Sequence, residues 1–307
     1  MSVLVVGSVA LDSVETPFGE RDNVLGGSAT YFSAAASLLT KVAVVGVVGE
    51  DFPTAQLEFL TARGVDLAGL ETVPGRTFRW KGRYGFDLNQ AQTLETHLNV
   101  FEKFDPKLGA VAKACDRLFL GNIDPELQLK VLTQVARPKL VCADTMNYWI
   151  GSKRQKLLEL LPRVDVLLVN DAEVRELAGE SNVMKAAAAA RKMGAKAVVV
   201  KRGEYGALLA TEEGHFYSPA FPLHEVVDPT GAGDTFAGGF LGLLDRLDSN
   251  STEALKQAVV MGSTIASFTV EQFSLDRLRA LTLKEVRARY SSFKKLTHFG
   301  ELDASVG

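Results

Sequence analysis

The sequence predicts an α/β protein with a doubly wound, mostly parallel sheet flanked by helices, and with a small β lid. Short apolar runs alternate with helical segments over most of the chain, which is typical of a parallel sheet covered on both faces. One stretch, residues 77–101, instead alternates apolar and polar residues with period two. The length of 307 residues suits one large domain, so we expect a single domain over residues 1–300 and a polar tail over 301–307.

The strands of the main sheet are predicted from continuous apolar runs, because strands buried on both faces lack polar alternation. These runs lie at 3–6, 41–48, 117–120, 140–143, 166–169 and 197–200, followed by a hairpin of 207–210 and 214–217. Helices fill the intervals, several of them rich in Ala. We expect them at 28–39, 54–62, 125–135, 153–161, 172–177, 183–193, 252–270 and 283–295.

Two segments with period-two alternation predict the lid. In the first, Phe78, Trp80 and Tyr84 alternate with basic residues, and 93–101 alternates in the same way. This pattern indicates half-buried antiparallel strands that lie outside the doubly wound layer. We expect them to form the lid sheet together with residues 13–24, and an ordinary edge hairpin is the alternative.

Composition excludes several classes of function. The net charge of −3 and the lack of a basic run argue against nucleic acid or a membrane surface as partner. No apolar run approaches membrane-spanning length, and the amino terminus is typical of a buried strand rather than a signal peptide. Cys115 and Cys142 lie in or beside apolar runs, so we expect a reducing, cytoplasmic setting without a disulfide. The four histidines show no metal-ligand spacing.

Several polar or glycine-rich segments follow predicted strands. Asp12, expected in a loop, follows the first strand, Gly26-Gly27 opens the first helix, and Asp144 follows a later strand. Open α/β sheets bind ligands at the carboxyl ends of their strands. We therefore expect these segments to meet in one crevice.

The stretch 226–240 carries the strongest functional signal. Its two opening valines should end a strand, Asp-Pro-Thr-Gly should make a turn, and a buried helix should follow. The N–H groups of Gly231, Ala232 and Gly233 would be unpaired at the helix start, where donors and helix dipole attract an anion. Asp234, ionised beside that anion site, could accept a proton from a hydroxyl that attacks phosphorus. The alternative is a tight turn with an Asp that only stabilises the helix.

The order of residues over 228–234 resembles the C-terminal signature of the ribokinase-like, or PfkB-type, carbohydrate kinases. The resemblance implies that Asp234 is the catalytic base and that the amides of the Gly-Ala-Gly run hold the transferring phosphoryl group. It also implies ATP and Mg²⁺ as cofactors, with Thr230 on the ATP side. Asp228 would support the loop that holds K⁺, or another monovalent cation, in some members.

Asn170 and Glu173 follow another strand, and their spacing places them on one face of a helical turn. An amide and a carboxylate there could hold a hydrated Mg²⁺ near phosphates. The alternative is a helix-capping Asn with a solvated Glu. The family has an Asn-x-x-Glu element that organises Mg²⁺ and phosphate, and these residues match it.

The segment 201–206 follows the next strand and resembles the nucleotide-binding turn of the family, with Gly203 and Gly206 three residues apart. Lys201 stands where a Thr-like residue is usual, and a solvated charged turn is the alternative. A later helix resembles the one that flanks adenine in the family, which would place Ser263 near the purine.

The amino-terminal half resembles the acceptor side of these kinases. Asp12 matches the Asp that binds substrate hydroxyls, and a carboxylate can accept hydrogen bonds from two neighbouring O–H groups. A turn-capping Asp is the alternative. Gly26 and Gly27 match the pair that hinges the lid and lets substrate approach the backbone. Tyr31 replaces the usual Asn, and an aromatic ring there could stack on a sugar or join the core.

We therefore expect a carbohydrate kinase, a phosphotransferase with an alcohol acceptor, that works on a sugar with ATP. A nucleoside or inositol kinase of the same family is the alternative, and a non-catalytic sugar or nucleotide sensor is a remote one. The chain has neither the Gly-x-Gly-x-x-Gly of nicotinamide enzymes after its first strand nor a P-loop sequence. We expect a monomer or a homodimer that associates through the lid.

Overall fold

The computed structural model describes residues 2–298 and 300; the tail predicted at 301–307 lies outside the described residues. Its main sheet has nine strands in the order β13-β12-β11-β10-β9-β8-β1-β4-β5. The seven from β11 to β5 run parallel, and β12 and β13 form an antiparallel hairpin beside β11. The strand bounds are β1 (Val3–Val6), β4 (Val42–Gly49), β5 (Asp66–Val73), β8 (Arg117–Leu120), β9 (Leu140–Asp144), β10 (Val166–Asn170), β11 (Ala197–Lys201), β12 (Ala207–Ala210) and β13 (His215–Ser218).

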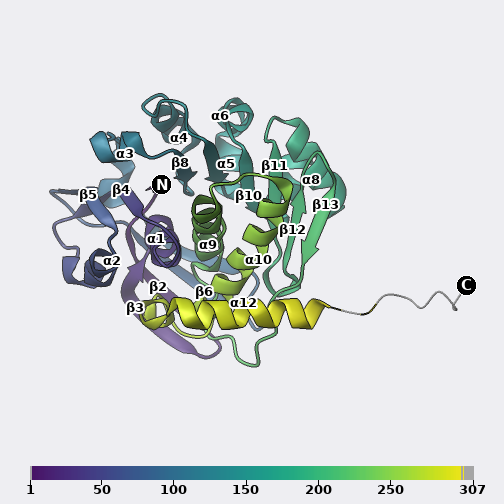
Figure 1. The fold of residues 1–307 in the computed structure, drawn as a ribbon. Coiled ribbons are helices and arrows are strands. Elements are labelled where there is room, and N and C mark those ends of the chain that lie inside the picture. Colours follow the sequence, from purple (N-terminus) through teal and green to yellow (C-terminus); the bar gives the residue numbers. More distant parts are fainter. Residues whose placement is uncertain (1, 299, 301–307) are drawn as a thin grey trace, which may run out of the picture.

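The helices cover both faces of this sheet, which confirms the predicted fold class. Figure 1 shows α1, α9 and α10 together in front of the sheet, with α12 running across one end of them. The helix bounds are α1 (Ser28–Ala36), α2 (Glu58–Ala62), α3 (Ala110–Ala114), α4 (Pro125–Leu132), α5 (Asn147–Ser152), α6 (Arg154–Leu160), α7 (Asp171–Ala178), α8 (Val183–Lys192), α9 (Ala232–Leu247), α10 (Thr252–Thr269), α11 (Asp276–Ala280) and α12 (Leu283–Thr297). Within residues 2–298, every helix is too short or too polar to span a bilayer.

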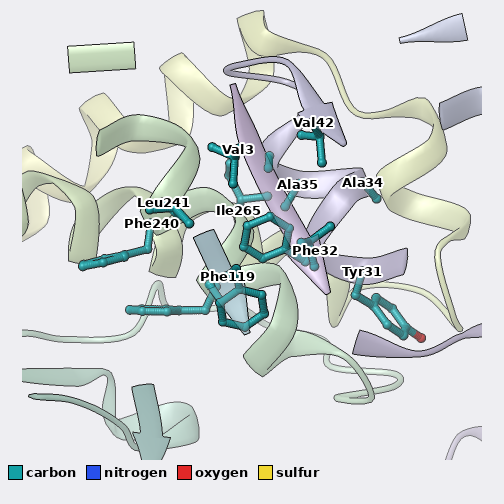
Figure 2. Close-up of a cluster of buried hydrophobic side chains, with 14 of the residues drawn as sticks. Val3, Tyr31, Phe32, Ala34, Ala35, Val42, Phe119, Phe240, Leu241 and Ile265 are labelled. Carbon is teal, nitrogen blue, oxygen red and sulfur yellow. The ribbon is translucent and has the colours of Figure 1, made fainter. Parts of the chain in front are cut away.

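Two apolar cores lie on the two faces of the sheet, because successive side chains of a strand point in opposite directions. Val3 and Val5 of β1 pack with the core under α1, α9 and α10, whereas Leu4 and Val6 pack with the core under α4, α6, α7 and α8. In the first core the rings of Phe32 and Phe119 stack with centroids 4.5 Å apart (Figure 2). The alternation explains why the strands have no polar face.

The predicted lid is a separate sheet of four strands, in the order β3-β2-β6-β7. Its strands are β2 (Ala10–Thr16), β3 (Gly19–Gly26), β6 (Arg79–Tyr84) and β7 (Ala91–His97). It is not an edge hairpin of the main sheet, since β2 joins the hairpin of β6 and β7 in parallel. The lid strands follow the carboxyl ends of β1 and β5, so the lid is anchored at the ligand-binding edge of the main sheet.

Several features of local structure differ from the predictions. Asp12 lies within β2 rather than in a loop, because it pairs with Val24 of β3 and with Trp80 of β6. The valines before Asp228 are not in a strand; Val227 is held instead by a hydrogen bond from its N–H to the carbonyl of Val270. The edge strand β5 was missed because its exposed side leaves it without a continuous apolar run. The second lid segment ends as a strand at His97 and continues as a 3₁₀ turn.

Candidate active site

Three adjacent strands of the main sheet end in polar residues at the same edge. β9 ends at Asp144, β10 ends at Asn170 and β11 ends at Lys201, and Asn170 is paired directly with Lys201 in the sheet register. The order of strands reverses between β1 and β8, close to β9. Open α/β sheets bind ligands at such a switch point, so the sheet brings these side chains to the expected crevice.

The helix α9 begins with free backbone donors. Gly231 precedes it with φ +74°, a left-handed conformation that favours glycine. Among the described residues, the N–H groups of Gly231, Gly233 and Asp234 have no hydrogen-bond acceptor. Ala232 differs from the expectation: its N–H donates to the carbonyl of Pro229 at 3.1 Å, because these residues form a turn. The donors available to an anion are therefore those on either side of Ala232.

Asp234 is in the first turn of α9, where its side chain is partly buried. Burial and repulsion by Asp144 raise the pKa of its carboxyl to about 7, while the ammonium of Lys201 acts in the opposite direction. A carboxyl that titrates near neutral pH is suited to accept and release a proton.

Lys201 is held against this helix start rather than in solvent, so the solvated-turn alternative is wrong for this residue. Its Nζ donates to Asp144 Oδ2 at 2.8 Å, and the two side chains are only 16% and 7% exposed. A Cβ added to Gly233 would lie 3.1 Å from the same Nζ. Burial works against the charge, but Asp144 and Glu173 outweigh it and raise the pKa of Lys201 above its ordinary value. The ammonium is therefore a fixed positive charge beside the free N–H of Gly233.

Asn170 and Glu173 form a reciprocal capping box at the start of α7. Asn170 Oδ1 accepts from the N–H of Glu173 at 2.8 Å, and Glu173 Oε2 accepts from the N–H of Asn170 at 2.7 Å. The Asn is thus a helix cap, as the alternative held, but Glu173 is buried rather than solvated. Burial and repulsion by Asp144 raise the pKa of Glu173 to about 8.

Asp12, on lid strand β2, has a buried carboxylate. It occupies the space beside Gly26, where an added Cβ would overlap it. Burial raises the pKa of Asp12 to about 7; a hydrogen bond from the backbone of Gly27 opposes this, and repulsion by Asp228 and Asp234 adds to it. The base candidate and the lid carboxylate are therefore near enough to interact.

Gly27 and Tyr31 connect the lid to the core at the start of α1. Gly27 caps this helix with φ +93°, and an added Cβ would collide with the backbone of Ser8. Tyr31 is only 1% exposed, and its ring points away from the Phe32 stack (Figure 2). Burial and the nearby Asp228 raise the pKa of its hydroxyl. Its contact with substrate stays a prediction.

Asp228 fixes the loop that precedes α9. Its Oδ1 accepts from the N–H of Thr230 at 2.9 Å, and its Oδ2 accepts from the N–H of Ser274 at 3.0 Å. The hydroxyl of Thr230 in turn donates to the hydroxyl of Tyr84, on lid strand β6, at 3.4 Å. Sequence reasoning placed Tyr84 in the lid but had no signal for its contact with the loop before α9.

The tip of the lid reaches the turn 201–206. Asn89, between β6 and β7, donates from Nδ2 to Glu204 Oε1 at 3.1 Å. Its amide oxygen fills the space beside Gly203, where an added Cβ would overlap it. Gly206 closes the turn with its N–H donating to the carbonyl of Gly203 at 3.1 Å. The lid, which also carries Asp12, therefore contacts the predicted nucleotide turn.

The small residues of α10 serve mainly in packing. A Cβ on Gly262 would lie 2.8 Å from the carbonyl oxygen of Phe236 on α9, and the hydroxyl of Ser267 accepts from Arg289 at 3.0 Å. Ser263 is half-buried between them, and its place near a purine stays a prediction.

Sequence reasoning missed the pairing of Asp144 with Lys201. Asp144 was expected in the crevice, but nothing in the sequence gives the order of strands that brings β9 within reach of β11. In residues 2–298, no group of three His, Cys, Asp or Glu side chains is arranged to hold a metal ion by itself.

Comparison with known proteins identifies the family. The family model described as pfkB family carbohydrate kinase matches residues 3–278. The cytidine kinase of Thermococcus kodakarensis is 34% identical over 252 residues, which cover 78% of this chain and 87% of that protein.

Solved structures share the fold over nearly the whole chain. A nucleoside kinase of Burkholderia thailandensis, solved in complex with inosine, superposes with a TM-score of 0.76 at 21% identity and covers 94% of this chain and 97% of its own. An E. coli protein described as a ribokinase II, solved with ATP and Mg²⁺, has a TM-score of 0.76 at 21% identity and covers 95% and 99%. The chain therefore belongs to the pfkB family of carbohydrate kinases and is a phosphotransferase with the ribokinase-like fold.

Proposed function

We propose that this protein transfers the γ-phosphoryl group of ATP, with Mg²⁺, to a hydroxyl of a sugar. The observation that carries the proposal is the position of Asp234 at the start of α9, beside the free N–H groups of Gly231 and Gly233. The ATP and Mg²⁺ in the E. coli structure and the cytidine kinase relative support it.

Asp234 is the base in this proposal. Its carboxylate accepts the proton of the acceptor hydroxyl while the hydroxyl oxygen bonds to the γ-phosphorus and the bond from that phosphorus to the β-γ bridging oxygen breaks. The products are a phosphate ester and ADP. A pKa of about 7 lets Asp234 take up the proton in the crevice and then return it to solvent.

The free amides of Gly231 and Gly233 receive the oxygens of the transferring group. Fixed donors stabilise the charge that develops there without reorganisation during the reaction. The Ala232 amide, committed to Pro229, holds the shape of the turn. In this proposal Thr230 and Lys201 contact the nucleotide, and Gly203, Gly206 and Ser263 belong to the same nucleotide site.

Glu173 is the residue that would hold Mg²⁺, through water. Its carboxylate and that of Asp144 repel each other in a buried setting, which a divalent cation would relieve. Mg²⁺ in kinases is commonly held by one or two carboxylates, waters and substrate phosphates, so a full set of protein ligands is not required. When bound, the ion neutralises charge on the phosphates. Asn170 keeps Glu173 in place through the capping box.

Asp12 binds the acceptor in this proposal. Its carboxylate can accept hydrogen bonds from two neighbouring hydroxyls, and it shares the crevice with Asp234. Gly26 leaves space for the Asp12 carboxylate itself, Gly27 allows the close approach of the Ser8 backbone, and Tyr31 packs on Gly231 at the start of α9. The lid excludes water, which would otherwise compete as acceptor.

A nucleoside is the second candidate for the acceptor, and the lid favours it. Trp80 pairs with Asp12 in the register of β6 and β2, so the two side chains point to the same face. The Trp80 ring lies over Gly82, where an added Cβ would overlap it. Phe78, by contrast, stacks on Phe101 with centroids 5.4 Å apart. Trp80 therefore offers a flat surface on which a base could stack beside the carboxylate.

Three finer points complete the proposal. We place the protein in the cytoplasm, because Cys115 and Cys142 are free and buried.

On the family resemblance, K⁺ would act at the loop of Asp228, where both oxygens of the carboxylate accept backbone hydrogen bonds. We favour a monomer over a lid-mediated dimer, because Glu15 on the outer lid face pairs with Lys81 and Arg83, which makes that face polar.

An acceptor screen tests the function. The purified protein is incubated with Mg-ATP and sugars, inositols or ribonucleosides, and ADP is measured with and without each acceptor, in K⁺ and in a K⁺-free buffer. The proposal expects ADP formation that depends on a sugar or nucleoside and is stoichiometric with a new phosphate ester. Phosphorylation of inositol alone would move the acceptor to that class. ATP hydrolysis at the same rate with and without every acceptor would contradict the proposal.

A further inference from the structure

The crevice contains an ion pair whose cation has unused hydrogen-bonding capacity. An ammonium has three donors. Among the described residues, Lys201 Nζ donates only to Asp144 Oδ2, at 2.8 Å. Two of its donors are therefore available, although the side chain is only 16% exposed. A buried cation that keeps donors free is suited to an anionic ligand.

The position of the ammonium defines where that ligand would lie. Nζ is 3.1 Å from the point that a Cβ of Gly233 would occupy, and the aliphatic arm of Lys201 runs along the same glycine. The unpaired N–H groups of Gly231 and Gly233 are at this helix start. A phosphoryl group on those amides would therefore also meet the ammonium.

The surrounding charge explains why a cation is needed there. Asp144, Glu173 and Asp234 gather around Lys201, and each is close enough to raise its pKa. Three carboxylates without a cation would repel a phosphate. Asp144 can hold the ammonium in place with one hydrogen bond while the other donors stay free, since its second oxygen accepts from the N–H of Thr145 at 2.8 Å.

We propose that Lys201, fixed by Asp144, bridges that carboxylate and the γ-phosphoryl group of the nucleotide held at the start of α9. Lys201 would contact the reacting group and stabilise its charge during transfer, and Asp144 would be a positioning residue that acts through Lys201. This inference rests on the proposed function and deepens it, because it gives the ammonium a partner on ATP that ADP lacks.

The first test replaces the charge and keeps a hydrogen bond to Asp144. Lys201→Gln should lower kcat roughly 10²–10³-fold, the usual effect of losing one preorganised donor. In calorimetry without acceptor, the substitution should also weaken ATP binding by at least about tenfold while changing the affinity for ADP by less than about threefold. The matched control is Lys196→Gln, whose exposed side chain pairs with Asp165 just before β11 and which should leave both quantities unchanged. If Lys201→Gln changed the affinities for ATP and for ADP by the same factor, or changed neither, the proposal would be overturned.

The second test separates charge from fold. In Asp144→Asn with Lys201→Met, neither charge is left buried without a partner. If the pair were only structural, this double variant would recover the activity and melting temperature lost by a single change. We expect the melting temperature to recover while kcat and the preference for ATP over ADP stay low. Recovery of both would overturn the proposal.

The proposed function and the role of Lys201 can be contradicted separately. If the native protein phosphorylates no acceptor, the proposed function fails, and the nucleotide affinities still decide the role of Lys201. If the native protein is a kinase and Lys201→Gln keeps its kcat, only the inference about Lys201 fails.

Discussion

The aromatic ring of Tyr31 packs directly on Gly231, so that a Cβ at Gly231 would overlap three carbons of the ring. This contact joins the first helix, which leads out of the lid, to the turn that starts α9. Tyr31 therefore supports the turn that precedes α9. The shape of the turn before α9 thus depends on a residue some two hundred positions earlier in the chain.

Gly231→Ala should therefore destabilise the protein through two effects. The left-handed conformation costs an L-residue about 1–2 kcal/mol. Overlap with Tyr31 should add about 1–3 kcal/mol of overpacking. Gly64→Ala is the matched control, because Gly64 has φ +79° with nothing within 4 Å of an added Cβ. Urea unfolding should show a clearly larger loss for Gly231→Ala, and equal losses would contradict the steric contact.

Asp12→Asn should weaken acceptor use and leave the nucleotide end intact. An ionised carboxylate makes hydrogen bonds of about 1.5–3 kcal/mol each, and the amide can accept with only one oxygen. The acceptor KM or kcat/KM should worsen at least about tenfold, while ADP affinity and slow background ATP hydrolysis persist. Unchanged acceptor kinetics would remove Asp12 from the acceptor pocket.

The same variant should be more stable than the native protein at alkaline pH. The pKa of Asp12 rises from 3.8 to about 7 on folding, so the folded state holds the proton more tightly. The stability linked to this proton is complete below pH about 4 and is lost as pH rises through about 7. Asp12→Asn has no such loss, so its melting temperature relative to the native protein should rise from pH 5 to pH 8. A turn-capping role predicts the opposite, a lower melting temperature at both values.

Activity should fall on the acid side of neutrality. The pKa of Asp234 is raised from 3.8 to about 7, chiefly by burial, and the base works only when it has lost its proton. The kcat/KM for the acceptor should therefore rise with pH and level off above pH about 7. A profile that is flat between pH 5 and pH 8 would show that no group with this pKa is required.

Much of this architecture could be predicted because it follows from local patterns. The strand at Val3–Val6 needs only a continuous apolar run, and the lid strand at Arg79–Tyr84 needs only period-two alternation. The turn before α9 and the start of that helix could be located from their residue order, whereas the phosphate site and the role of Asp234 stay predictions. The capping box of Asn170 with Glu173 is equally local.

What could not be predicted depends on contacts between distant segments. The ion pair of Asp144 with Lys201 requires the order of β9, β10 and β11, which no local pattern contains. The hydrogen bond of Asn89 to Glu204 requires the lid to lie across the crevice. The Ala232 amide was expected to be free, but it is committed to a turn whose geometry only the folded backbone reveals.

The most direct test of the central claim is acceptor-dependent phosphoryl transfer by the native protein and by Asp234→Asn. Transfer from γ-labelled ATP is followed into the phosphate ester of whichever sugar or nucleoside the screen identifies, with Glu253→Gln, in the exposed first turn of α10, as control. Asn is nearly isosteric with Asp, so the fold and ADP affinity should be retained. We predict that Asp234→Asn loses roughly 10²–10⁴-fold in kcat, the usual effect of a general base, while the control is unchanged. Near-native transfer by a correctly folded Asp234→Asn protein would contradict the account.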